Sequence, residues 1–239
     1  MPEIRPELAP LPPRMQRLPL DARGYPVPWF VAWVIPAADG SFTDVGSSTP
    51  GAVPEFRAAD RQKWQQAIKH ARCWVCGEPL GAFKTFVLGP MCGINRTTSE
   101  PPCHRACAIW SAQNCPFLVR PHMDRRQHEA LVATGSTSTI GGVGLTRNPG
   151  VTLVWTTKSF EVWTPKPGER LIHIGEPTEI LWFAEGRTAT RAEVEASVAG
   201  GLPSLMALAV AQQREEGVPA VKELEHQVAT FAATHYPTL

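Results

Sequence analysis

Two close pairs of potential metal ligands stand out in the sequence. Two residues separate Cys73 from Cys76, two separate His104 from Cys107, and 27 residues lie between the pairs. Thiolate and imidazole groups arranged in two such pairs are the usual ligands of a tetrahedral zinc ion. The spacing therefore predicts a structural Zn²⁺ site made by Cys73, Cys76, His104 and Cys107.

Three further cysteines leave the ligand set partly open. Cys103 could take the place of His104, and Cys92 could take the place of either. Cys115 has no role in this assignment. The alternative interpretation, that all of these are reduced and buried cysteines, does not account for two pairs that both have ligand spacing.

The elements that would position these ligands follow from the local sequence. Gly77 directly follows the second cysteine, where a tight knuckle turn favours a residue that tolerates positive φ. Residues 82–95 predict a short β-hairpin, broken at a Gly-Pro pair. Residues 101–113 predict a helix that ends at Cys115 and carries His104 and Cys107 on one face. This order of knuckle, hairpin and helix resembles a treble-clef zinc finger, and the ligand pattern resembles half of a LIM domain.

The same residues argue against a catalytic zinc ion. A catalytic site keeps one coordination position open for water, whereas four protein ligands fill the shell. HNH nucleases share the treble-clef scaffold but need a general-base histidine in the hairpin, and FVLGPMCGINR contains none. The HxE and PCxxC elements of zinc deaminases are absent as well.

Upstream of the knuckle, the sequence predicts an arm, a strand, a loop and a helix. Residues 1–28 contain eight prolines and predict an extended arm whose leucines contact the rest of the molecule. The apolar run at residues 29–35 predicts a strand buried on both faces. Residues 36–54 are rich in small and turn-forming residues and predict a loop. An amphipathic helix is expected after Asp60, a suitable N-cap.

Downstream, residues 134–150 are rich in Gly, Ser and Thr and predict a flexible linker. Four short apolar runs in residues 151–183 predict an antiparallel meander. Thr190 and Glu193 have capping-box spacing for a helix expected to end at Gly200-Gly201, with two more helices after it.

These expectations define an α+β fold: a treble-clef-like zinc module, an antiparallel β-meander and C-terminal helices. The expected domains are an extended arm (1–28), a basic module with the zinc site (29–133), a linker (134–150), and a meander with C-terminal helices (151–239).

Charge is unevenly distributed along the chain. The net charge is +1, but residues 57–147 hold 12 Lys and Arg against 5 Asp and Glu. Such a segment is typical of contact with phosphates or with an acidic protein surface, although ordinary surface charge produces the same pattern. The residues expected to form a nucleic-acid or partner surface are Arg61, Lys63, Lys69, Lys84, Arg96, Arg105, Arg120, Arg125 and Arg126.

Several longer segments resemble an uncharacterised family of phage and bacterial proteins. In that family the residue before His104 need not be cysteine, which implies that His104 and Cys107 form the second ligand pair. The resemblance also implies an accessory role in a phage or mobile element, but no activity. The segments that carry it are LPLDARGYPVPWFVAW, CWVCGEPLG, GPMCGINR, SEPPCHRACA, CPFLVRP, NPGVTLVW and GRTATRAEVEAS.

The expected function is that of a non-enzymatic, zinc-stabilised protein that binds nucleic acid through its basic surface. One alternative is an effector that binds and inhibits a host protein complex. Another is a nuclease-like or nucleic-acid-modifying enzyme that uses His122, His128 and Glu129 beside the zinc site. The sequence does not indicate the oligomeric state.

Cysteine usage and hydropathy predict the compartment. A metal-ligand pattern of cysteines indicates a reducing, cytoplasmic environment rather than a disulfide framework. The N-terminal MPEIRPELAP lacks the apolar core of a signal peptide. The apolar runs WFVAWVI and LMALAVA are too short to span a bilayer, so no membrane contact is expected.

Overall fold

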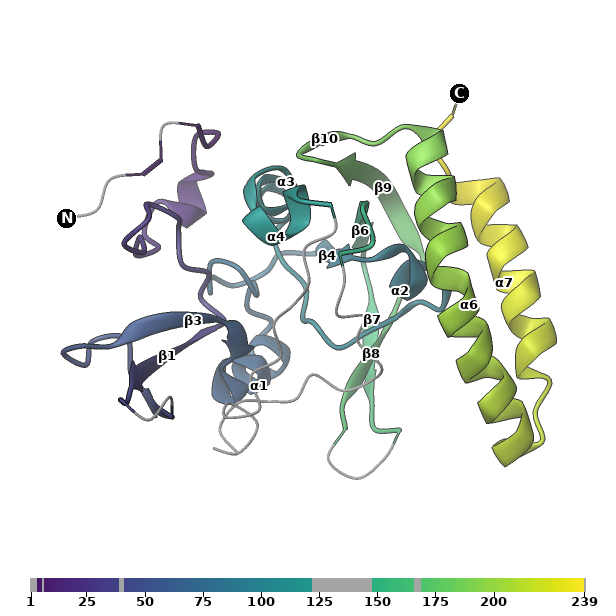
Figure 1. The fold of residues 1–239 in the computed structure, drawn as a ribbon, viewed down its shortest axis with the longest axis horizontal. Coiled ribbons are helices and arrows are strands. Elements are labelled where there is room, and N and C mark those ends of the chain that lie inside the picture. The colour runs from purple at the N-terminus through teal and green to yellow at the C-terminus, as the bar shows by residue number, and fades with distance from the viewer. Residues whose placement is uncertain (1–3, 6, 39–40, 122–147, 166–168, 239) are drawn as a thin grey trace.

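A four-stranded antiparallel sheet, in the order β10-β9-β6-β4, lies at the centre of the computed structural model (Figure 1). The structure describes residues 4–5, 7–38, 41–121, 148–165 and 169–238. Within them, antiparallel sheets and helices form the mixed α+β fold that the sequence predicted. The strands of the central sheet are β4 (Lys84–Leu88), β6 (Thr152–Thr157), β9 (Pro177–Ala184) and β10 (Arg187–Thr188).

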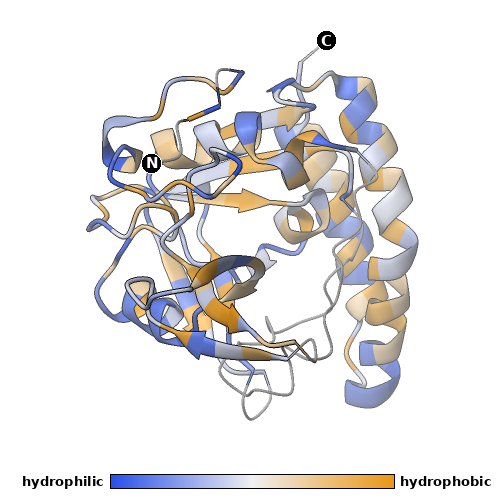
Figure 2. Cartoon of the chain, turned by 60° about the vertical axis from the view of Figure 1, so that its left-hand side comes forward, coloured by the Kyte–Doolittle hydropathy of each residue, from blue (hydrophilic) through white to orange (hydrophobic). Residues whose placement is uncertain are grey.

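Helices cover both faces of this sheet. Side chains alternate between the two faces of a strand, so neighbouring residues of β6 enter different cores. Leu153 and Trp155 pack in a core with α2 (Pro90–Ile94), α6 (Arg191–Glu216) and α7 (Ala220–His235). Val154 packs in a second core with α3 (Arg105–Asn114). Figure 2 shows the central strands as predominantly hydrophobic, as burial on both faces requires.

The four strands predicted between residues 151 and 183 are present, but their pairing order is not sequential. β6 pairs with β9, while β7 (Phe160–Trp163) and β8 (Leu171–Ile174) form a hairpin between them in the chain. That hairpin pairs with β5 (Thr97–Thr98) in a separate three-stranded sheet, in the order β5-β8-β7. The strand order differs from a meander because β6 pairs with β4 along one edge and with β9 along the other. Neither edge of β6 is then left for β7.

A third sheet, in the order β2-β1-β3, interrupts the loop expected at residues 36–54. It consists of β1 (Val31–Pro36), β2 (Phe42–Val45) and β3 (Val53–Ala59). The loop prediction was therefore wrong at β2, in the middle of that segment, and at its two ends. β1 is buried at Val31 and Val34, and its backbone bonds to a strand on each side.

The elements that flank the metal-ligand residues agree better with the sequence. α1 (Arg61–Lys69) begins at Asp60, whose Oδ1 accepts backbone hydrogen bonds from Gln62 and Lys63 at 2.8 and 3.1 Å. The proline-rich arm contains a short 3₁₀ helix, η1 (Pro13–Met15), and its leucines pack in the core that contains α3. α4 (Pro116–Val119) follows α3 directly.

The helix predicted to end at Gly200-Gly201 does not stop there. It is the first part of α6, which is 26 residues long in all and has its C-cap at Gly217 with φ 70°. Thr190 and Glu193 form the predicted capping box at its start. A Cβ at Gly201 would lie 2.9 Å from Met91, so this glycine permits close packing against α2 rather than ending the helix.

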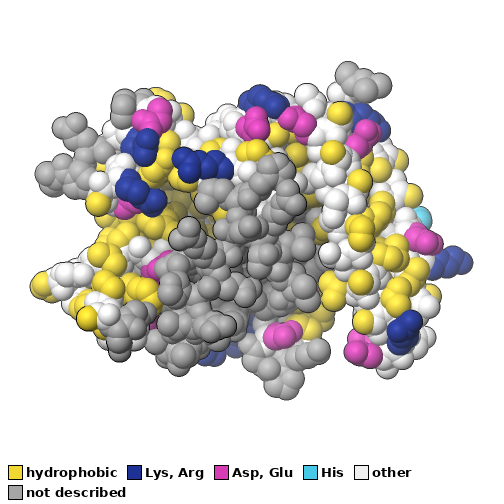
Figure 3. All heavy atoms as spheres, viewed as in Figure 1, with side chains coloured by type: hydrophobic (Ala, Val, Ile, Leu, Met, Phe, Trp, Pro, Cys, Tyr) yellow, Lys and Arg dark blue, Asp and Glu magenta, His cyan; other side chains and the backbone are white. Residues whose placement is uncertain are grey.

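α6 and α7 lie side by side at one end of the molecule (Figure 1). In the described part of the chain, α6 alone is long and apolar enough to cross a membrane by length and composition. Figure 3 shows hydrophobic side chains over these two helices. Val194, Val198 and Ala209 of α6 pack in the core, although only 17% of the apolar window of this helix is buried.

Candidate metal centre

The first ligand pair lies on a tight turn after α1. Gly77 has φ 76° and donates its N–H to the Cys73 carbonyl at 2.8 Å, which closes the turn. The N–H of Cys76 points to Cys73 Sγ at 3.4 Å. A Cβ at Gly77 would lie 2.7 Å from the Trp29 ring, so both the φ angle and the packing require glycine.

The second ligand pair lies at the start of α3. His104 is the N-cap of α3 with extended φ and ψ of −69° and 146°, and Cys107 lies in the first turn. The helix was predicted to begin at residue 101, but the residues before His104 are extended. Cys103 exchanges two backbone hydrogen bonds with Thr85 of β4, which fixes this segment against the central sheet.

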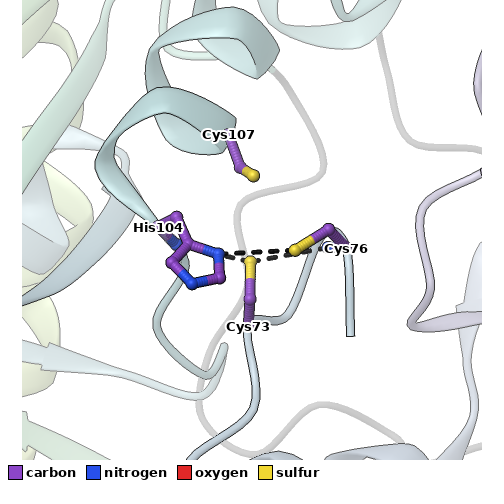
Figure 4. Close-up of side chains that lie close together, drawn as sticks. All are labelled: Cys73, Cys76, His104 and Cys107. Carbon is purple, nitrogen blue, oxygen red and sulfur yellow. Dashed lines mark hydrogen bonds between the residues drawn. The ribbon is translucent and has the colours of Figure 1, made fainter. Parts of the chain in front are cut away.

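The four predicted ligands converge on one point. Their potential ligand atoms all lie within 4.8 Å of one another (Figure 4). Cys76 Sγ lies 3.3 Å from His104 Nδ1, and the backbone N–H of His104 donates to Cys73 Sγ at 3.3 Å. Cys73 and Cys107 are fully buried, whereas Cys76 and His104 are partly buried.

The orientation of the His104 ring suits metal binding. Its Nε2 lies 3.0 Å from the Pro79 carbonyl, which can only accept a hydrogen bond. Nε2 therefore carries a proton, and Nδ1, which points into the cluster, is the nitrogen that would ligate a metal ion after losing its own proton. A histidine that donates one ring N–H to a carbonyl while ligating through the other nitrogen is the common arrangement in metal sites.

Interactions among the ligands shift their pKa values in opposite directions. Hydrogen bonds, chiefly from the Cys103 thiol and then from Cys107 and Cys76, hold the pKa of Cys73 well below its ordinary value. The same thiolate raises the pKa of Cys107 and raises the pKa of His104 to about 10. The metal-free cluster thus concentrates negative charge on Cys73 and retains protons on Cys107 and His104, which a cation would displace.

These residues fit a metal ion with all positions filled by protein. The group contains three sulfur atoms and one nitrogen atom, and it includes no carboxylate. Soft thiolate ligands disfavour magnesium and calcium. Four protein ligands leave no open position for a substrate or a reactive water.

The treble-clef resemblance is not confirmed, because the predicted hairpin does not form. β4 is its first half as expected, but the MCGIN segment is helical and belongs to α2. β4 pairs instead with β6, far along the chain. Gly93 lets α2 approach the core closely, since a Cβ there would lie 2.4 Å from Leu153 Cδ2.

The structure also places the three remaining cysteines. Cys92 lies on α2 and packs in the core on the opposite side of the central sheet, so it cannot replace a ligand. Cys115 is the C-cap of α3. Cys103 is buried and contacts Cys73, but it lies outside the group of four. Of the two alternative ligands, Cys92 and Cys103, only Cys103 lies near the cluster.

Two of the predicted basic residues, Arg96 and Arg105, are held in ion pairs. Arg105 makes a bidentate ion pair with Glu179 at 2.5 and 2.7 Å, and Arg96 pairs with Glu176 while donating to the Ile174 carbonyl. Figure 3 shows Lys and Arg scattered over the face drawn, several of them beside Asp or Glu.

The remaining basic residues divide into bound and exposed groups. Lys63 donates to the Val31 carbonyl at 3.1 Å, and burial lowers its pKa. Lys84 donates to the Gly81 and Ala82 carbonyls. Arg61, Lys69 and Arg120 are exposed, and the first two lie on α1. Outside the described residues lie Arg125, Arg126, His122, His128 and Glu129.

Two residues that support the centre carry no signal in the sequence. Trp29 covers the knuckle through its contact with Gly77, and its backbone N–H donates to the Val75 carbonyl at 2.7 Å. Pro79 supplies the carbonyl that orients His104. Neither residue type is a ligand, so no spacing rule identifies them.

No family model, no curated protein and no solved structure matches this chain.

Proposed function

We propose that Cys73, Cys76, His104 and Cys107 bind a structural zinc ion. The observation that supports this most is the convergence of three thiols and one oriented imidazole within 4.8 Å. Zinc is the common ion for a closed set of three cysteines and one histidine. The ion would join the knuckle after α1 to the start of α3, and so fix elements that are distant in the sequence.

Zinc analysis tests this proposal directly. Protein purified without metal affinity steps and without added metal is expected to contain one zinc ion per chain. A cobalt-substituted sample should show the visible absorption of tetrahedral thiolate coordination. Absence of bound metal in protein that has the native fold would refute the proposal.

We further propose that the protein is a non-enzymatic binding protein for nucleic acid, with the exposed side of α1 as its contact surface. This helix directly precedes the knuckle, and its solvent-exposed residues are cationic or polar. Cationic side chains without carboxylate partners are the ones that can neutralise phosphates. The residues of this surface are Arg61, Gln62, Gln65, Gln66, Lys69 and His70.

The experiment is binding to labelled single-stranded and duplex DNA and RNA at two salt concentrations. The double variant Arg61→Ala, Lys69→Ala should lower the slope of log K against log salt by about 1 per lost phosphate contact. Arg105→Ala is the matched control, because its guanidinium is already paired with Glu179. Equal slopes for all three proteins would exclude α1 as the contact surface.

A second candidate function, binding to another protein, is favoured by a different observation. Arg96 and Arg105, two of the predicted nucleic-acid contacts, are paired with glutamates of the same chain. Guanidinium groups held by glutamates of the same chain are less available to phosphates. Recovery of a stoichiometric protein partner after nuclease treatment would support this candidate over nucleic-acid binding. The phage or mobile-element role implied by the resemblance remains a prediction.

A further inference from the structure

The central sheet has an open edge along β9. β10 contributes only Arg187 and Thr188, which pair with Ala184 and Phe183. The N–H of Ala189 then donates to the Trp182 carbonyl at 2.9 Å, and the chain turns away into α6. Among the described residues, no strand pairs with the earlier part of β9 on this side, although β6 pairs with it on the other.

The backbone direction of each residue on β9 follows from these pairs. Alternate residues of an antiparallel strand direct their N–H and C=O groups to opposite sides. Because Trp182 directs its carbonyl toward the β10 side, Ile180 directs both its N–H and its C=O to the same side, where β10 has ended. Leu181 and Glu179 direct theirs toward β6. Ile180 therefore offers one donor and one acceptor to an incoming strand.

A groove of about 480 Å³ lies along this edge. One side is formed by β9 and the other by the C-terminal segment after α7. That segment is held in place by a 2.8 Å hydrogen bond from Trp182 Nε1 to the His235 carbonyl. The residues that line the groove around Ile180 include Leu181, Trp182, Ala189, Tyr236 and Pro237.

The chemistry of the groove favours one kind of occupant. A donor and an acceptor on the same residue of a strand edge match the backbone of an extended peptide. The C-terminal segment after α7 forms the wall of the groove opposite β9. Charge at the start of the groove is neutralised, since Glu179 is bound by Arg105. The lining combines apolar side chains with threonine hydroxyl groups, which suits an uncharged segment.

We propose that the groove between β9 and the C-terminal segment binds an extended, uncharged segment of a partner protein, which adds a strand beside Ile180. This function is independent of the metal centre and of nucleic-acid binding by α1. Exposed strand edges are used in this way for peptide recognition, with main-chain hydrogen bonds supplying affinity and adjacent pockets supplying specificity.

Hydrogen exchange in the full-length protein provides the first test. The Ile180 amide should exchange rapidly in the free protein, whereas the Leu181 and Glu179 amides, which face β6, should be protected. A protected Ile180 amide in the free protein at low concentration would overturn the proposal, since the edge would already be covered. Protection that rises with protein concentration would show a second copy at the edge and would also overturn it.

The second test uses short random peptides displayed on their encoding mRNA and selected against the full-length protein. Selected peptides should protect the Ile180 amide, and N-methylation at alternate peptide positions should abolish binding. Ile180→Pro should weaken binding at least ~10-fold. Proline is accepted at a strand edge where the N–H faces solvent, so this variant should keep its fold. Ile180→Val, which retains the N–H, is the matched control and should bind like the parent.

Two results of the selection would refute the proposal. One is that no selected peptide loses affinity for folded Ile180→Pro protein. The other is that binding survives N-methylation at every position of the peptide, which would show recognition through side chains alone. If Ile180→Pro fails to fold, the N-methylated peptides and the exchange of the Ile180 amide in the parent protein decide the question.

Discussion

The backbone N–H of His104 donates a hydrogen bond to Cys73 Sγ over 3.3 Å, which joins the two ligand pairs directly. The same sulfur lies 3.4 Å from the N–H of Cys76 and contacts Cys103. Three donors around one buried thiolate stabilise its negative charge without any metal. Cys73 is therefore the residue around which the centre is built, and the other ligands complete it.

This arrangement predicts different outcomes for the two candidates for the fourth ligand. His104→Ala should lose most of the bound metal, because His104 Nδ1 points into the cluster. Cys103→Ala should keep the metal but bind it more weakly, because it removes only a donor to Cys73. Elemental analysis of each purified variant measures metal content. Full metal content in His104→Ala together with loss in Cys103→Ala would reverse the assignment.

Loss of the metal should unfold one core and spare the other. Cys73 and Cys107 lie in the core shared by α3, the knuckle and the proline-rich arm. Trp155 and Phe231 lie in the core on the opposite face of the central sheet. Cys76→Ser should therefore increase amide exchange in α3 while α7 remains protected, and should lower the free energy of unfolding by about 3 to 5 kcal/mol.

Cys92→Ala is the control for that experiment. Cys92 packs in the core with α7, and burial raises the pKa of its thiol to about 11, which keeps it protonated. This variant should retain metal and show normal exchange in α3. Equal exchange in both cores of Cys76→Ser would show a single cooperative unit and contradict the prediction.

Gly77→Ala should be strongly destabilising. The substitution forces a residue with a side chain to adopt φ 76° and places its Cβ 2.7 Å from the Trp29 ring. A left-handed conformation costs roughly 1–2 kcal/mol, and overpacking adds about 1–3 kcal/mol. Gly81→Ala is the matched control, since a Cβ added there would meet nothing within 4 Å and the φ of Gly81 is not positive. Chemical denaturation of both variants measures the difference.

Local rules predicted the ligand set and several helix boundaries because these depend on neighbouring residues. The Asp60 N-cap and the Thr190–Glu193 capping box are examples, and both form as expected. Ligand spacing is also local, so the sequence identified the four converging residues. The fourth ligand stayed open because Cys103 and His104 are adjacent, and only the extended backbone before α3 decides which side chain enters the cluster.

Contacts between distant segments decided the features that were predicted wrongly. The MCGIN segment forms a helix because Gly93 packs against Leu153, which no local pattern reveals. α6 passes through Gly201 because that glycine packs against Met91. Arg105 pairs with Glu179 across the fold, which is another contact that no local pattern reveals.

The capping box of α6 should contribute to stability in a pH-dependent way. The Arg187 guanidinium, with the N–H of Thr190, lowers the pKa of Glu193 to about 2. Because the folded-state pKa is depressed, the stabilisation is fully present above the unfolded pKa and is lost as pH falls from about 4.5 to about 2. The Glu193 carboxylate is partly exposed to solvent, so screening keeps the contribution below about 1 kcal/mol. Glu193→Gln should lower stability at neutral pH and reduce its change between pH 4.5 and 2, as measured by denaturation across that range.

Glu195→Gln, which removes an ion pair with Arg191 on the same helix, controls for the loss of a charge. If Glu193→Gln and the parent lose stability in parallel over that range, the carboxylate does not act through this cap.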